Sequence, residues 1–119
     1  MKILDVLRNE TILPNLKAHD KKSVLEELTI PVSQITQIEH STLVRMLMER
    51  EQLGTTGIGG GIAIPHGKLK ELASVIVCVG LSRKGITFDA MDGKPVNIFF
   101  LLFTPEGATD LHLTLLSQI

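Results

Sequence analysis

The segment Val96–Phe103 (VNIFFLLF) is the most apolar stretch of the chain, with Asn97 as its one polar residue. A short continuous apolar run of this kind is typical of a strand that is covered on both faces. It therefore predicts a central strand, ended by the breaker sequence that begins at Thr104. The β-branched run Val75–Leu81 predicts a second buried strand. These two runs favour a fold organised around a buried sheet.

Amphipathic helices are predicted on both sides of these strands in the sequence. Lys21–Thr29 places apolar residues on one face, and Pro31 is predicted to end that helix because the residue before a proline is pushed out of the helical region. Ser41 is a plausible N-cap for a second helix that stops near Gly54, and Asp110 can cap a third. Interspersed helices and strands predict a layered α/β arrangement with helices covering a sheet.

The length of 119 residues predicts a single domain covering residues 1–119. The apolar pattern of the last predicted helix runs to Ile119 with no capping residue after it. The sequence therefore leaves two alternatives: either this helix frays at its end, or the chain is a piece of a longer domain that is incomplete at its C-terminus.

Composition argues against several classes of function. The net charge is −1, no basic run is present and aromatic residues make up 3 %, so nucleic-acid binding is not expected. No apolar run approaches the ~20 residues that a membrane span needs. The single cysteine, Cys78, has no partner for an internal disulfide, which favours a reducing, cytoplasmic location, and its apolar surroundings predict a buried core residue.

The segment Thr56–Lys68 (TGIGGGIAIPHGK) contains the glycine cluster that most invites a phosphate-binding interpretation. A Walker loop fails, because five residues separate Gly61 from Gly67 and Leu69 replaces the magnesium-binding hydroxyl. A dinucleotide fingerprint counted from Gly57 fails as well, at its third glycine. A nucleotide-binding regulatory domain is thus a weak alternative, although glycines still allow close approach of backbone N–H groups to an anion.

His66 is distinguished from the other histidines by its neighbours. Pro65 fixes its own φ and favours an extended Ile64, while Gly67 lets the chain turn away directly afterwards. The imidazole is thereby held with little backbone freedom, and with an ordinary pKa of about 6.5 much of it is neutral at pH 7. A neutral imidazole nitrogen can attack a phosphoryl group and form a covalent phosphohistidine.

Among the other histidines, His112 is the informative one. It falls in the first turn of the helix that Asp110 caps, where the helix dipole favours an anion, so it would add to a phosphate-receiving surface if the fold brings it to His66. His19 and His40 are predicted to be surface residues. No metal site is predicted, since no two ligands have the spacing of a known motif.

Three segments together resemble one protein family. REQLGTTGIGGGIAIPHGKL from Arg50, FDAMDGKPVNIFFLL and DLHLTLLSQI are similar to the enzyme IIA domains of the bacterial phosphoenolpyruvate-dependent phosphotransferase system, fructose/mannitol class. The resemblance implies an α/β fold in which a mixed β-sheet is flanked by helices on both faces. It also implies a missing C-terminal portion, because family members usually continue further.

The resemblance implies roles for three residues. His66 matches the histidine that accepts the phosphoryl group on Nε2, His112 matches a second histidine beside it, and Arg50 matches an arginine suited to stabilising charge. The implied donor is a histidine-phosphorylated carrier of the HPr type, and the implied acceptor is a IIB-type cysteine or a set of regulated proteins. No cofactor is implied, because both reacting groups are protein side chains.

Within the family, the sequence PHGKL and the absence of attached domains resemble the nitrogen-regulatory enzyme IIA. A sugar-specific, fructose-type enzyme IIA is the alternative. A structural module that only binds partners remains a rival of another class, and it would keep its function without His66.

Overall fold

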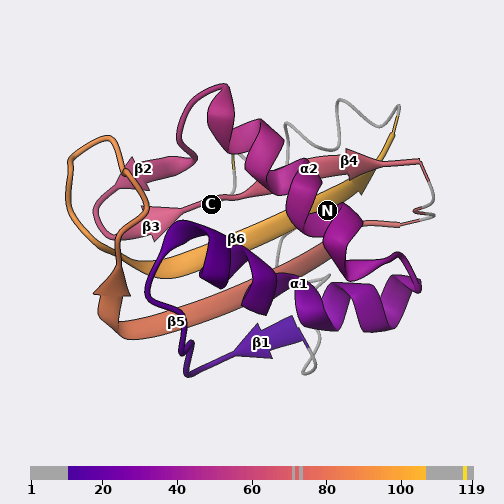
Figure 1. Ribbon diagram of the computed structural model, residues 1–119, viewed down its shortest axis with the longest axis horizontal. Helices are drawn as coiled ribbons and strands as arrows, with labels where there is room; N and C mark the ends of the chain where they lie inside the picture. The colour runs from indigo at the N-terminus through magenta and orange to yellow at the C-terminus, as the bar shows by residue number, and fades with distance from the viewer. Residues whose placement is uncertain (1–10, 71, 73, 107–116, 118–119) are drawn as a thin grey trace.

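The computed structural model describes residues 11–70, 72, 74–106 and 117, and its strands form a six-stranded mixed sheet (Figure 1). The strands are β1 (Ile12–Leu13), β2 (Gly57–Gly59), β3 (Ile62–Ala63), β4 (His66–Leu69), β5 (Ile76–Ile86) and β6 (Val96–Pro105). Their order is β1-β5-β6-β3-β2, and β4 pairs with β6 further along the same strand.

The central strand predicted from the apolar run is β6. It pairs antiparallel with β5 and parallel with both β3 and β4, so it has neighbours on each side. The side chains of Phe99, Leu101 and Phe103 are fully buried on one face of the strand, and Leu102 is fully buried on the other. The strand continues through Thr104, beyond its predicted end, because Thr104 is buried and pairs with Lys68 of β4.

The first helix, α1, spans Lys21–Thr36 and does not end before Pro31 as predicted. A proline inside a helix costs about 3 kcal/mol. The stripe begun by Leu25 and Leu28 continues past it to Val32, and all three side chains are fully buried. Because burial of each such side chain contributes roughly 1.5–3 kcal/mol, the continued stripe offsets the proline.

The second helix, α2, spans His40–Gln52 and is capped by Glu39 rather than by the predicted Ser41. The backbone N–H groups of Thr42 and Leu43 donate to the Glu39 carbonyl oxygen. The His40 ring contributes to this start, since its Nε2 lies 2.7 Å from the carbonyl oxygen of Glu26 on α1. A contact between helices thus sets the first residue of α2.

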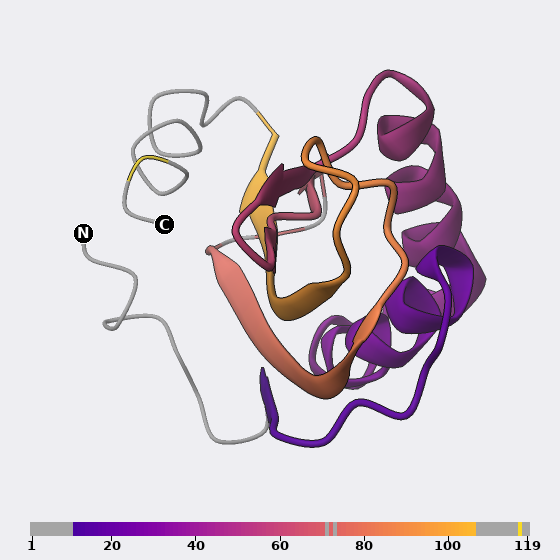
Figure 2. The same ribbon diagram turned by 90° about the vertical axis from the view of Figure 1, so that its left-hand side faces the viewer.

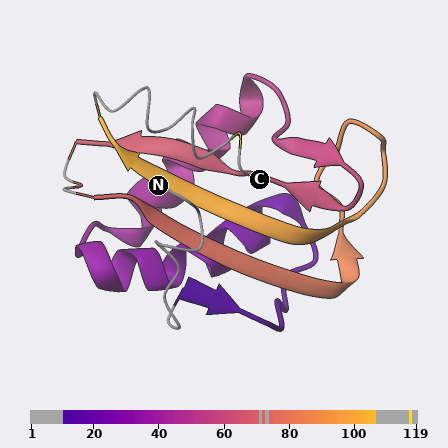
Figure 3. The same cartoon turned by 180° about the vertical axis from the view of Figure 1, so that it is seen from behind.

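Both described helices lie on the same face of the sheet, as Figure 2 shows from the side and Figure 3 from behind. The main hydrophobic core lies between them and strands β5 and β6. The predicted mixed α/β fold is confirmed by the six-stranded mixed sheet and its helices. A helix on the second face stays a prediction, because Asp110, where a third helix is predicted, lies outside the described residues. Neither described helix is long and apolar enough to cross a membrane.

Candidate functional site

His66 is the first residue of β4, directly after the buried Pro65. The strand pairs in parallel with β6, with His66 opposite Leu102, and the Leu102 N–H donates to the Pro65 carbonyl oxygen at 2.9 Å. The backbone of the histidine is therefore held by its pairing with β6, and the ring itself is half-buried. The backbone is constrained before the ring, as Pro65 predicts, but the predicted turn at Gly67 is wrong, because pairing with β6 keeps the strand extended through Leu69.

One hydrogen bond determines which ring nitrogen of His66 carries a proton. Nδ1 lies 2.7 Å from the carbonyl oxygen of Ile64. A carbonyl oxygen only accepts, so Nδ1–H is the donor and the lone pair of the neutral ring lies on Nε2. The geometry thus favours Nε2 as the nucleophile.

The ring borders a hollow of about 400 Å³ between α2 and the start of β4. Its lining residues are Met46, Arg50, His66, Gly67 and Lys68. Met46 and Arg50 are four residues apart on α2 and so share one face of the helix. His66 and Lys68 are two residues apart in a strand, which likewise places them on one face. Three nitrogen-bearing side chains therefore surround a single hollow.

The pKa of His66 is lowered from its ordinary value of 6.5. Burial of the ring is the largest cause, and the positive charge of Arg50 acts in the same direction. The hydrogen bond to the Ile64 carbonyl and the negative charge of Glu51 oppose these effects without cancelling them. The ring is consequently more often neutral near pH 7 than an exposed imidazole would be.

Arg50 occupies the last turn of α2, and its Nη1 donates to the carbonyl oxygen of Gly54 at 3.0 Å. This bond orients the guanidinium at the edge of the hollow that also holds His66. The structure therefore brings together two of the three predicted site residues. The third, His112, lies outside the described residues, so its distance from His66 stays a prediction.

The glycine cluster forms a β-hairpin rather than an open approach to the histidine. β2 and β3 pair antiparallel, and Gly60 and Gly61 make the turn with φ angles of +65° and +80°, which favour glycine. Gly57 has a different role, because a Cβ there would lie 2.9 Å from the backbone of Ala90. These glycines serve a tight turn and a close packing contact.

Glu51 is a buried residue next to the site that the sequence did not indicate. Its side chain is 3 % exposed, and its Oε1 accepts a hydrogen bond from the Thr56 N–H at 3.1 Å. Its Oε2 accepts from the Thr56 hydroxyl, and the Lys21 ammonium on α1 lies 3.4 Å from Oε1. Lys21 also reaches Asp89 at 3.4 Å, so one ammonium joins a buried and an exposed carboxylate.

A second hollow of about 210 Å³ continues from the first along α2 and β4. It is lined by Ile38, Thr42, Met46, Lys68, Leu69, Lys70 and Glu106. Met46 and Lys68 line both hollows, so the two lie next to each other, and we refer to them together as the groove. The sequence could have indicated Lys68 through its two-residue spacing from His66, but only if a strand had been predicted there.

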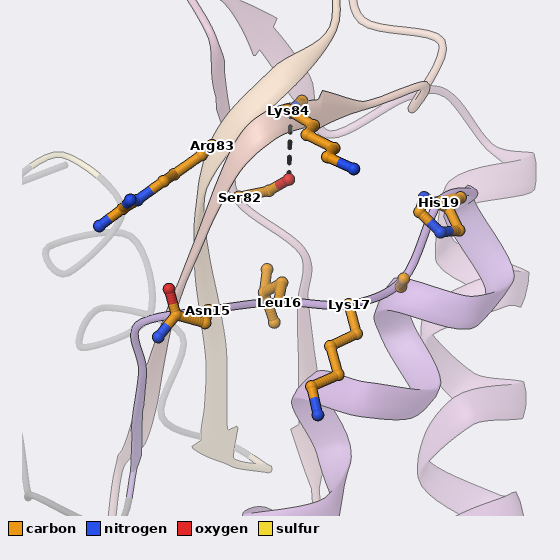
Figure 4. A pocket seen from close by; sticks show the side chains of 9 residues that line it. Asn15, Leu16, Lys17, His19, Ser82, Arg83 and Lys84 are labelled. Atoms are coloured by element: carbon orange, nitrogen blue, oxygen red, sulfur yellow. Dashed lines mark hydrogen bonds between the residues drawn. The ribbon is translucent and has the colours of Figure 1, made fainter.

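A separate hollow of about 330 Å³ lies at the other end of β5 (Figure 4). Its lining residues are Asn15, Leu16, Lys17, Ala18, His19, Ser82, Arg83, Lys84 and Gly85. Although the lining is basic, Figure 4 shows the side chains of Lys17 and Arg83 pointing in different directions, so the charges do not converge on one point. We assign no chemistry to this hollow.

The remaining candidate groups lie away from the groove. Cys78 is fully buried in β5, as its apolar surroundings predict, and burial raises the pKa of its thiol to about 12. Within the described residues, no three His, Cys, Asp or Glu side chains gather in an arrangement that could hold a metal ion.

Comparison with known proteins identifies relatives along nearly the whole chain. Residues 5–119 match the family model described as "Phosphoenolpyruvate-dependent sugar phosphotransferase system, EIIA 2". A nitrogen regulatory protein of Bradyrhizobium diazoefficiens is 42 % identical over 119 residues, which cover 100 % of this chain and 78 % of that protein. The fructose-specific EIIABC component of Bacillus subtilis is 31 % identical over 120 residues, covering all of this chain and 19 % of that longer protein.

A solved structure agrees with these relationships. The crystal structure of nitrogen regulatory protein IIA-Ntr from Neisseria meningitidis superposes with a TM-score of 0.90 at 35 % sequence identity. The match covers 96 % of this chain and 78 % of that one. The likeness therefore extends from the sequence to the arrangement of helices and strands.

Proposed function

The chain belongs to the EIIA 2 family of the phosphoenolpyruvate-dependent sugar phosphotransferase system, and on that basis we propose that it is a phosphocarrier whose acceptor is His66. The donor is a histidine-phosphorylated carrier protein of the HPr type. The observation that carries the proposal is the hydrogen bond from Nδ1 to the Ile64 carbonyl oxygen, because it leaves the lone pair of the neutral ring on Nε2.

The transfer step requires only protein side chains. Nε2 of His66 attacks the phosphorus atom and forms an N–P bond, while the N–P bond of the donor breaks and the donor imidazole keeps its electron pair. His66 retains the proton on Nδ1, so its ring becomes an N-phosphoryl imidazolium. No water or metal ion has to supply a proton or a charge in this balance.

Arg50 and Lys68 border the hollow into which the phosphoryl group would be delivered. A guanidinium offers a fork of donors that matches two phosphoryl oxygens, and an ammonium adds a second positive charge. In this proposal Arg50 stabilises the charge on the oxygens as they move from donor to acceptor. His112, predicted to lie beside the acceptor, assists or orients the same group.

The donor docks on the groove along α2 and β4 that passes the histidine. The groove combines apolar residues such as Ile38 and Met46 with the cations Lys68 and Lys70. An apolar centre with a polar rim is the usual composition of a protein–protein contact. Docking there would place the phosphoryl group of a carrier beside the His66 ring.

The phosphorylated form regulates other proteins, in line with the nitrogen regulatory relatives. A sugar-specific role is the second candidate, favoured by the 31 % identity to a fructose-specific EIIABC component. A fructose-type IIB protein distinguishes the two: rapid transfer from His66 to its cysteine supports the sugar role, whereas retention of the label on His66 supports the regulatory role. In both cases we expect the chain to act in the cytoplasm.

Phosphorylation from labelled phosphoenolpyruvate, with enzyme I and an HPr-type carrier present, tests the assignment of His66. We expect one acid-labile, base-stable label that is lost in His66→Ala and kept in the control His40→Ala, since His40 contacts α1 and not the groove. A label that persists in His66→Ala would show that another residue is the acceptor. His112→Ala is expected to slow the transfer but keep some label.

The role of Arg50 has a matched control on the same helix. Arg50→Ala removes a cation from the hollow and is expected to slow phosphorylation by roughly 10²-fold, which is typical when one charge-stabilising donor is lost. Arg45→Ala removes an exposed arginine whose Nε lies 4.0 Å from Oε1 of Glu49, and it should leave the rate unchanged. Equal rates for the two variants would exclude Arg50 from the transfer.

A further inference from the structure

We propose that Glu51 is a positioning residue for phosphoryl acceptance, because hydrogen bonds connect its carboxylate through Thr56 and Ile64 to the His66 ring. The proposal rests on the proposed role of His66 as acceptor. Glu51 touches neither the donor nor the phosphoryl group in this view. It acts by fixing Thr56, which in turn bonds to Ile64, the residue whose carbonyl oxygen accepts from the His66 ring.

The first link is the contact between Glu51 and Thr56. Both residues are buried, and the two carboxylate oxygens take different Thr56 donors, Oε1 the backbone N–H and Oε2 the hydroxyl. Lys21 approaches Oε1 from α1 at 3.4 Å. A buried carboxylate that accepts this many bonds fixes its donors in one geometry, because losing any of these bonds leaves a charge poorly compensated away from water.

The second link runs across the hairpin from Thr56 to the histidine. The carbonyl oxygen of Thr56 accepts a bond from the Ile64 N–H at 2.9 Å, and the carbonyl oxygen of Ile64 accepts the bond from His66 Nδ1 at 2.7 Å. Pro65 lies between Ile64 and His66 and locks its own φ, so few dihedral angles remain to adjust. The direction of the Ile64 carbonyl therefore depends on where Glu51 holds Thr56.

Electrostatics gives Glu51 a second effect on the same ring. The ring gains positive charge when Nε2 bonds to phosphorus, and a nearby negative charge favours that state. Consistent with this, Glu51 acts to raise the pKa of His66, whereas its neighbour Arg50 acts to lower it. Two adjacent residues of α2 thus act on the two charges that develop, Glu51 on the cationic ring and Arg50 on the anionic phosphoryl group.

The arrangement follows the logic of a serine–histidine–aspartate triad, in which a buried carboxylate sets the tautomer of a catalytic histidine. In this protein the carbonyl oxygen of Ile64 contacts the ring directly, and the carboxylate of Glu51 lies further along the chain of hydrogen bonds. Loss of a carboxylate bonded directly to a catalytic histidine lowers the rate ~10⁴-fold. Because the Ile64 carbonyl remains in place, removing Glu51 should cost less.

Glu51→Gln keeps the shape of the side chain but removes its charge and one of its two acceptor oxygens. We expect phosphorylation to slow by about tenfold or more, the scale of losing an outer partner that orients a histidine, and by less than the ~10⁴-fold above. In the unphosphorylated protein, ¹⁵N NMR of the imidazole should show a smaller fraction of the Nδ1–H tautomer and a lower His66 pKa. A variant with the wild-type tautomer, titration and rate would overturn the proposal.

Asp89→Asn is the matched control. Asp89 contacts the same Lys21 ammonium at 3.4 Å, but its side chain is 79 % exposed and lies outside the chain of bonds to His66. It should leave the tautomer and the rate unchanged. If Asp89→Asn changes them as much as Glu51→Gln does, general loss of charge around Lys21 is responsible, and the proposal fails.

A second pair of variants covers the case in which Glu51→Gln does not fold. Thr56→Val removes the hydroxyl that bonds to Glu51 at nearly constant volume, and it should shift the tautomer in the same direction as Glu51→Gln. Thr56→Ser keeps the hydroxyl and should restore the wild-type spectrum, whereas equal spectra for both variants would refute the relay. The NMR measurement needs no donor protein, so it tests the hydrogen-bond relay independently of phosphorylation. If wild-type His66 is not phosphorylated, the proposed function is refuted, and the NMR result still shows whether Glu51 sets the tautomer of the ring.

Discussion

The lowered pKa of His66 predicts how phosphoryl acceptance depends on pH. Only the neutral ring is a nucleophile, so the rate of phosphoryl acceptance falls as the pH drops through the pKa of His66 in the folded protein. An imidazole with the ordinary pKa of 6.5 is about 24 % neutral at pH 6.0 and about 91 % neutral at pH 7.5, a ratio of roughly four. Because burial and Arg50 lower the pKa, the neutral fraction of His66 should change less than fourfold over this range.

The titration is followed by the imidazole ¹H and ¹⁵N shifts of His66, which are assigned by their loss in His66→Ala. Single-turnover phosphorylation, in which the donor is loaded beforehand at one fixed pH, gives the matching rates. Arg50→Ala should move the midpoint upward, since the positive charge of Arg50 disfavours the imidazolium. A wild-type midpoint at or above 6.5, or a downward shift in Arg50→Ala, would refute this account of the site.

Two further predictions concern β5. Gly80→Ala would place a Cβ 2.6 Å from a methyl group of the fully buried Leu28. It should lower the free energy of unfolding, measured by urea denaturation, by about 1–3 kcal/mol, and an unchanged midpoint would contradict this. The Cys78 thiol is fully buried, and burial raises its pKa to about 12. It should not react with a thiol-specific reagent in the native protein but should react once the chain is unfolded, and rapid labelling of the native protein would contradict its burial.

The parts of the fold that could be predicted were those set by long apolar patterns. The run ending at Phe103 identified β6 as the central strand, and the apolar stripe of α2 identified a helix. The end of α1 and the start of α2 were wrong because tertiary contacts decide them. Burial of Val32 carries α1 past Pro31, and the contact of His40 with Glu26 starts α2 before Ser41.

At the candidate site, too, features with a local cause could be predicted and features that depend on tertiary contacts could not. The proline before His66 indicated a constrained histidine, because its effect on the backbone is local. The turn predicted at Gly67 was wrong, since pairing with β6 extends the strand to Leu69. Glu51 could not be found from sequence, since a glutamate at the end of an amphipathic helix looks like any solvated residue. Its burial depends on Thr56 across a loop and on Lys21 from another helix, and neither contact has a local sequence signal.

Under the proposed function, the bond between Nδ1 of His66 and the Ile64 carbonyl oxygen also predicts which isomer of phosphohistidine the protein carries. With Nδ1 committed to that carbonyl, phosphorylation yields τ-phosphohistidine, in which phosphorus is bonded to Nε2, and the π isomer is excluded as long as the bond holds. Isomer-selective antibodies would therefore recognise the loaded protein with one specificity only. A hydrogen bond between residues on either side of Pro65 thus selects the ring nitrogen that can be phosphorylated, and it is in place before any partner binds.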